Sequence, residues 1–158
     1  FATMSDDSDS DVDMPEMSVE DQGEIMRLDA ELKENPNVYD SHAQLIGLLK
    51  KCGLKGRLQS AREELRSRFP LSEDLWRDWL NDEIGNVAGD EDVEMIEALF
   101  EVAVADYLSI PIWGDYLQFL TALDTEVSEH SDAGASKMRG VCERALTACG
   151  MHFTQGAE

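Results

Sequence analysis

The sequence predicts an all-α fold, a right-handed α-solenoid of antiparallel helix pairs preceded by a disordered acidic tail. An aromatic pair at Trp76 and Trp79 recurs downstream at Trp113 and Tyr116, and His42 stands at the first of these positions upstream. Repeats of roughly 20–50 residues are typical of solenoids, because one unit cannot bury its apolar face alone. Apolar residues also recur at helical spacing, and no segment alternates with a period of two over the length of a strand.

Composition limits the classes of function. The 158 residues carry a formal net charge of -21, so most of the surface would repel a phosphate backbone and direct nucleic-acid binding is not expected. The cysteines are odd in number and no secretory signal is visible, which favours a reducing, intracellular compartment without a disulfide framework. No apolar run reaches the roughly 18 residues that span a bilayer, so we expect no membrane association.

Residues 1–19 are predicted to form the disordered acidic tail. They contain six acidic and no basic side chains, and too little apolar surface to offset the entropy lost on ordering. Ser8 and Ser10 each have an acidic residue three positions on, which suits an acid-directed kinase. The alternative is a tail that only improves solubility.

Residues 20–35 are predicted to form a short capping helix that covers the first repeat. Ser18 followed by Asp21 resembles a capping box, and Ile25, Leu28 and Leu32 then share one helical face.

The repeat array is expected over residues 36–158, beginning with a pair at about 36–70. Its first helix is predicted from Asn35, with Gly53 after its end, and the loop at 54–56. Its apolar stripe comprises Tyr39, His42, Leu45, Ile46, Leu49 and Cys52. The partner helix carries Leu58, Ala61, Leu65 and Phe69, and Pro70 stops it. A loop this short makes the two helices antiparallel neighbours.

Two further pairs are expected at about 72–108 and 109–150, with a loop at 85–89 in the first and a longer polar connection at 124–135 in the second. Ser72 is the expected N-cap of the first of these pairs, and the second is expected to open at Ser109-Ile110-Pro111. The second-helix stripes comprise Met95, Ile96, Leu99, Phe100, Ala103 and Val104, then Met138, Val141, Cys142, Ala145 and Leu146. Residues 151–158 resemble the start of another repeat, so we expect a fragment of a longer protein.

A tryptophan-x-x-aromatic first helix, a second helix containing Glu-Arg-Ala-Leu and a proline before the next pair form the pattern of half-a-tetratricopeptide (HAT) repeats. The chain resembles this family over roughly residues 36–150. The matching residues are Trp76, Trp79, Trp113, Tyr116, Arg139, Glu143, Arg144, Ala145, Leu146, Pro70 and Pro111. The departures are His42 for the first tryptophan, Cys142 for an aromatic residue and Glu97 for an arginine, and they affect the exact repeat boundaries.

Within the HAT family, the order of the motifs is most similar to that in factors that recycle U4 and U6 small nuclear RNAs. The resemblance implies a protein-docking scaffold of a nuclear RNA-processing factor that promotes U4/U6 snRNP reassembly in pre-mRNA splicing. It implies protein partners, namely snRNP proteins and also deubiquitinases or histones. The U4/U6 snRNA would bind only through RNA recognition motifs absent from this chain, and a homodimer would form through repeats not present here.

Two groups of side chains are candidates for function. The repeat-core signature comprises Trp76, Trp79, Trp113, Tyr116, Phe100, Leu65 and Cys142, which we expect to pack between helices; the alternative is a set of aromatic binding hot spots. The basic patch comprises Lys50, Lys51, Lys55, Arg57, Arg62, Arg66 and Arg68. It would dock an acidic partner segment or the acidic tail, or else form a solvated face with weak internal ion pairs.

No enzyme, cofactor or metal site is expected. Cys149 and His152 have the spacing of two zinc ligands, but a structural zinc site needs four ligands and no second pair is present. Cys52 and Cys142 are interpreted as small buried hydrophobes.

Two other functions remain open at this point. One is a HAT subunit of the 3′-end cleavage machinery or a core splicing factor. The other is a tetratricopeptide (TPR) chaperone adaptor, which would need a basic groove to clamp a peptide carboxylate.

Overall fold

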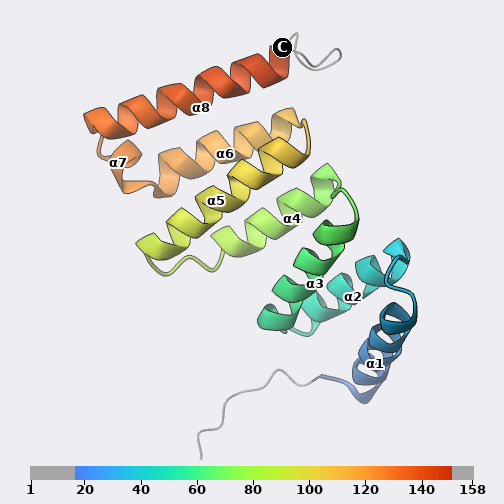
Figure 1. Ribbon diagram of the computed structural model, residues 1–158. Helices are drawn as coiled ribbons and strands as arrows, with labels where there is room; N and C mark the ends of the chain where they lie inside the picture. The colour runs from blue at the N-terminus through green and yellow to red at the C-terminus, as the bar shows by residue number, and fades with distance from the viewer. Residues whose placement is uncertain (1–16, 151–158) are drawn as a thin grey trace, which may run out of the picture. The chain divides into compact units, whose positions relative to one another are not determined.

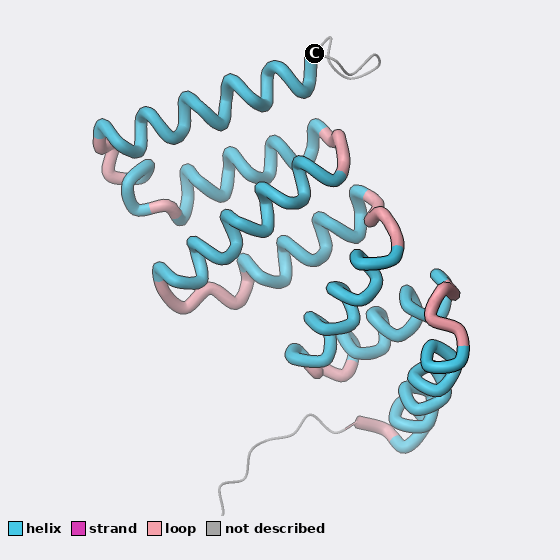
Figure 2. Tube along the Cα trace, in the orientation of Figure 1, coloured by secondary structure: helices cyan, strands magenta, loops and turns pink. Residues whose placement is uncertain are grey.

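The computed structural model describes residues 17–150, which form eight helices and no strand (Figure 1; Figure 2). This confirms the predicted all-α fold. These residues divide into two compact units, one ending at Phe69 and the other beginning at Pro70. The expectations for most of the acidic tail, with Ser8 and Ser10, and for a further repeat at 151–158 lie outside the described residues.

The first unit contains helices α1 (Val19–Glu34), α2 (Tyr39–Lys51) and α3 (Lys55–Arg68). Ser18 caps α1 as predicted, because its Oγ accepts a hydrogen bond from the backbone N–H of Asp21 at 3.0 Å. Helix α1 packs against α2, and α2 packs against α3. Gly53 has φ 68 in the turn between α2 and α3, a conformation that glycine adopts without a steric cost.

The core of the first unit is built from the predicted apolar faces. Its fully or nearly fully buried side chains are Ile25, Leu28, Leu45, Ile46, Leu49, Cys52, Leu58 and Leu65. His42 is also buried, and its Nε2 donates a hydrogen bond to the carbonyl oxygen of Pro36 at 2.9 Å. The imidazole therefore fills an aromatic position of the repeat with its polar atom satisfied.

Several predicted boundaries in the first unit were wrong. Helix α2 begins at Tyr39 and not at Asn35, because Asn35 ends α1 and its Oδ1 accepts the N–H of Asn37 in a turn. Tyr39 is 39% exposed, although its ring contacts Phe69 edge-on. Val19 belongs to α1 and not to the tail. The turn before α3 lies at residues 52–54, earlier than expected.

The second unit contains α4 (Glu73–Ile84), α5 (Asp90–Asp106), α6 (Ile110–Leu123), α7 (Thr125–Ser128) and α8 (Asp132–Gly150). Helices α4, α5, α6 and α8 lie side by side in chain order (Figure 1). Ser72 caps α4 as predicted, and Ser109 caps α6 in the same way, each accepting the backbone N–H three residues on. The helix pairs expected from the sequence are therefore present.

The connection before α8 differs from the prediction, which placed only a polar loop at 124–135. It contains the four-residue helix α7, capped by Asp124 through the N–H of Val127 at 2.9 Å. The chain then reverses at His130, whose φ is 57. Gly134 approaches α7 so closely that a Cβ there would lie 2.1 Å from the carbonyl oxygen of Glu126. Four residues are too few to produce a helical period, so the sequence pattern missed this helix.

Two residues of the stripes predicted for the second unit are exposed. Met95 on α5 is 53% exposed, and Leu146 on α8 is 74% exposed. A helical period defines the width of an apolar stripe, but it does not show which edge of that stripe a neighbouring helix covers.

Candidate protein-docking surface

The repeat-core signature lies mostly inside the two units. Its buried members, with their exposed fractions, are Trp76 (0%), Phe100 (0%), Tyr116 (0%), Leu65 (1%), Trp79 (2%) and Trp113 (5%). Within the second unit, the rings of Trp76 and Trp79 stack at 5.5 Å, and those of Phe100 and Tyr116 stack at 4.9 Å. Side chains this enclosed hold the helices together. A partner protein would instead contact exposed residues that lie between these buried ones in the sequence.

Three of these aromatic side chains also have their polar atoms paired. Nε1 of Trp76 donates to Asp106 at 3.1 Å, and Nε1 of Trp79 donates to Glu83 at 3.2 Å. The hydroxyl of Tyr116 donates to Glu101 at 2.6 Å. These bonds fix the orientation of each ring as well as its burial.

Trp113 is different, because its buried Nε1 has no hydrogen-bond partner in the structure. It holds the position in α6 that Trp76 holds in α4. Asp106, which accepts from Trp76, follows Phe100 by six residues, and the residue at the same distance from Cys142 is Ala148. The missing acceptor is thus explained by an alanine in the third repeat.

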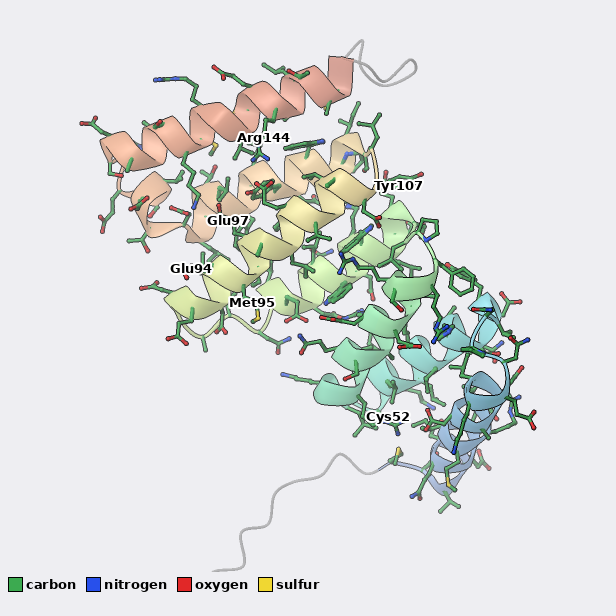
Figure 3. All side chains as sticks on the ribbon, in the orientation of Figure 1. Cys52, Glu94, Met95, Glu97, Tyr107 and Arg144 are labelled. Atoms are coloured by element: carbon green, nitrogen blue, oxygen red, sulfur yellow. The ribbon has the colours of Figure 1, made fainter. Side chains whose placement is uncertain are left out.

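Glu101 of α5 joins three helices. Its carboxylate accepts the hydroxyl of Tyr116 from α6 and two hydrogen bonds from Arg144 of α8, at 2.6 and 2.7 Å. Arg144 extends from α8 toward α5 (Figure 3), and its guanidinium lies 5.8 Å from the ring centroid of Trp113. The hydrogen bonds from Arg144 hold the pKa of Glu101 below its ordinary value despite partial burial.

Lys137 forms a second link between α8 and its neighbours. Its Nζ donates to Glu97 of α5 at 2.6 Å and to Asp124 at 2.7 Å. Burial alone would raise the pKa of Asp124, but the hydrogen bonds from Lys137 and from backbone N–H groups outweigh it, and the pKa is lowered. Lys137 and Asp124 line a cleft of about 290 Å³ whose other walls include Asp90, Glu94 and Glu126.

Of the residues in these two links, only Tyr116 was among the candidates predicted from the sequence. Glu97 and Glu101 lie four residues apart on α5, and Lys137 and Arg144 lie seven apart on α8, so each pair shares a helical face. That spacing was the available signal. Which helix would supply the opposite charge depended on the tertiary arrangement.

The basic patch is largely engaged within the first unit. Lys51 pairs with Asp21 at 2.8 Å and Arg57 pairs with Asp29 at 2.6 Å, so two of its members hold α1 against the following helix pair. Arg68 pairs with Glu64 of its own helix, and Arg62 is buried. The other members, all exposed, are Lys50, Lys55 and Arg66. A buried guanidinium cannot meet a partner, so Arg62 does not belong to an open docking surface.

Charge is divided unevenly between the units. Residues 17–69 carry nine basic and nine acidic side chains, whereas residues 70–150 carry four basic and eighteen acidic ones. Of those four cations, Arg77 pairs with Asp115, and Lys137 and Arg144 form the links described above. The second unit therefore presents a strongly acidic surface.

The described residues, 17–150, contain no candidate metal site. No group of three or more His, Cys, Asp or Glu side chains there could hold a metal ion. Cys52 is buried, and Cys142 and Cys149 are half-buried free thiols; His152 lies outside these residues. None of the described helices is long and apolar enough to cross a membrane.

The chain is similar to known proteins over most of its length. Residues 26–157 match the family described as the PRP39 N-terminal HAT repeat. A mouse protein named "Spliceosome associated factor 3, U4/U6 recycling protein" is 39% identical over 133 residues, which are 84% of this chain and 13% of that protein. The human protein of the same name is 38% identical over the same shares. A Caenorhabditis elegans protein of that name is 26% identical over 153 residues, 93% of this chain and 18% of its own length.

These matches confirm the resemblance inferred from the repeat pattern. The chain spans less than a fifth of the length of each of these three relatives.

Proposed function

Because this chain belongs to the HAT repeat family, we propose that it is a protein-docking scaffold of a nuclear factor that promotes U4/U6 snRNP reassembly in pre-mRNA splicing. The observation that carries the proposal is the alignment of 84% of the chain with relatives named as U4/U6 recycling proteins. The chain corresponds to a small part of those relatives, so we assign to it only the binding of proteins. The RNA would bind to RNA recognition motifs elsewhere in a longer protein.

The proposed role is binding by surface shape. The large aromatic side chains are buried in the helix seams, and the polar links around Glu101 and Lys137 fix neighbouring helices against one another. A rigid stack of helices offers a wide surface with little entropy to lose on binding. This supports a scaffold rather than a catalyst.

The charge of the second unit favours partners with basic segments. Eighteen acidic side chains against four basic ones would attract lysine- and arginine-rich polypeptides and steer their approach. The partners implied by resemblance are snRNP proteins, histones and deubiquitinases, and among them those with basic segments would bind this unit best.

The acidic surface also weighs against a TPR-type chaperone adaptor. Such a clamp binds a peptide carboxylate and needs uncompensated basic side chains in a groove. In the second unit, three of the four cations are already paired with carboxylates. A subunit of the 3′-end cleavage machinery or a core splicing factor is less well supported, since the relatives reported above are named as recycling proteins.

The proposed layout is an acidic tail before Ser18, the capping helix α1 at Val19–Glu34 and a repeat array at 36–158 within a longer protein. The pairing of Lys51 and Arg57 with carboxylates of α1 supports the capping role. The buried aromatic residues support their assignment as the seam of each repeat.

Affinity purification of the longer protein from nuclear extract, followed by sequencing of the co-purifying RNA, tests the proposal. Enrichment of U4 and U6 over other small nuclear RNAs is expected. Their absence, with the bait intact and folded, would refute the recycling role.

A further inference from the structure

The turn between α2 and α3 and its two flanking helix ends carry a dense group of positive charges. We call this group the basic turn and define it as Lys50, Lys51, Lys55 and Arg57, all four of which are exposed. These four side chains lie within eight residues of a chain that has only thirteen lysines and arginines and a net charge of -21. The basic turn is therefore a local positive surface on a strongly acidic protein.

Carboxylates of α1 already lie against the basic turn. Asp21, in the first turn of α1, pairs with Lys51 at 2.8 Å. Asp29, further along the same helix, pairs with Arg57 at 2.6 Å. The pair with Asp21 brings the start of α1 beside the basic turn, and residues 1–16 join the chain just before that point, at Met17 and Ser18.

Residues 1–16, which lie outside the described residues, have the charge to continue this series of contacts. They contain six carboxylates and no basic side chain. We call them the acidic segment. Exposed ion pairs are individually weak, but a tethered segment has an effective concentration on the order of millimolar, so several weak pairs together can hold it.

The tether permits more than one site, so charge density decides between them. The 16 residues of α1 are about 24 Å long, and 16 extended residues reach roughly 50 Å. Lys33, an exposed cation in the last turn of α1, is thus also within reach. It stands alone, whereas the basic turn offers four positive charges side by side in the sequence.

We propose that the acidic segment binds back onto the basic turn and covers it. The occupant of this surface is then part of the same chain, in continuity with the pair between Asp21 and Lys51. An acidic partner or a phosphate backbone must displace the acidic segment before it can bind there. The contact thus shields the basic turn from weak, non-specific binding of polyanions.

Zero-length carbodiimide cross-linking of the 158-residue chain tests the occupant, because it joins a carboxylate to a lysine amine only where the two groups meet. Mass spectrometry should find the acidic segment joined to Lys50, Lys51 or Lys55 at least about fivefold more often than to Lys33. This excess should largely disappear at about 0.5 M NaCl, which screens exposed charges. Equal cross-linking to Lys33, or an excess that salt leaves unchanged, would overturn the proposal.

Competition tests whether the surface is occupied. One variant has all six carboxylates of the acidic segment replaced by Asn or Gln. The matched control has the same net charge, because six exposed carboxylates of the second unit are replaced in the same way, namely Asp90, Glu91, Glu94, Glu126, Glu129 and Glu143. A fluorescein-labelled peptide of ten aspartates is titrated into each protein at low salt, and its anisotropy is measured.

The variant with the neutral segment should bind the peptide at least about fivefold more tightly than wild type, and the control should stay within about twofold. Lys50→Glu with Lys55→Glu, added to the neutral segment, should abolish the gain. Equal gains in the two neutralised variants, a gain that survives the charge reversal, or no binding to any variant would each overturn the proposal. Neither experiment involves RNA or splicing proteins, so failure of the recycling role would leave this inference intact.

Discussion

Replacement of Gly134 by alanine is expected to destabilise the second unit. The new Cβ would lie 2.1 Å from the carbonyl oxygen of Glu126 and 2.6 Å from the backbone nitrogen of Val127. Both neighbours are backbone atoms, so no side-chain rotation relieves the overlap and α7 must move away from α8. Overpacking of this kind costs on the order of 1–3 kcal/mol, and the distance places this case at the upper end. Each kcal/mol lowers the melting temperature by roughly 4–8 °C in a domain of 60–100 residues.

Gly140 provides the matched control on the same helix. No atom lies within 4 Å of a Cβ built there, so Gly140→Ala should stabilise the helix by about 0.5–1 kcal/mol. Thermal unfolding followed by circular dichroism should therefore show shifts of opposite sign. A Gly134→Ala protein as stable as the Gly140→Ala protein would refute the close packing of α7 on α8.

Three further changes test the packing and charges of the second unit. Trp79→Ala should cost about 3–5 kcal/mol in urea unfolding because the ring is buried, and an unchanged midpoint would contradict the seam assignment. Ala148→Asp should stabilise by on the order of 1 kcal/mol by giving Trp113 an acceptor, and the gain should vanish in a Trp113→Phe background. Glu101, whose pKa Arg144 lowers, should contribute stability above about pH 4 that disappears as the pH falls through the lowered pKa. The stability difference between wild type and Glu101→Gln should thus shrink from about pH 6 to pH 3, and a constant difference would argue against the link.

Local signals in the sequence predicted most helix ends. Ser18 and Ser72 were predicted as caps because a hydroxyl can accept the first free backbone N–H groups, and Gly53 was predicted to follow a helix end because it takes a backbone conformation that other residues avoid. These rules act over three or four residues, so one sequence is sufficient to apply them. The start of α2 was missed because Asn35 suits a turn as well as a helix start.

Long-range features could not be predicted in the same way. The spacing of Glu101 and Arg144 shows that each lies on a defined helical face, but their pairing across 43 positions depends on how the helices stack. The exposure of Leu146 has the same origin, since a stripe on α8 does not show which of its edges is covered. The sequence therefore predicts helices and their apolar faces better than it predicts the surface left for partners.

The central claim is that this region docks proteins while RNA is bound elsewhere in the longer protein. Deletion of residues 17–150 from the longer protein tests it most directly, with two readouts from one preparation. We predict that the affinity of the purified protein for U6 RNA stays within about twofold, while co-purification of snRNP proteins from nuclear extract is lost. Loss of RNA affinity with retention of the protein partners would contradict the claim.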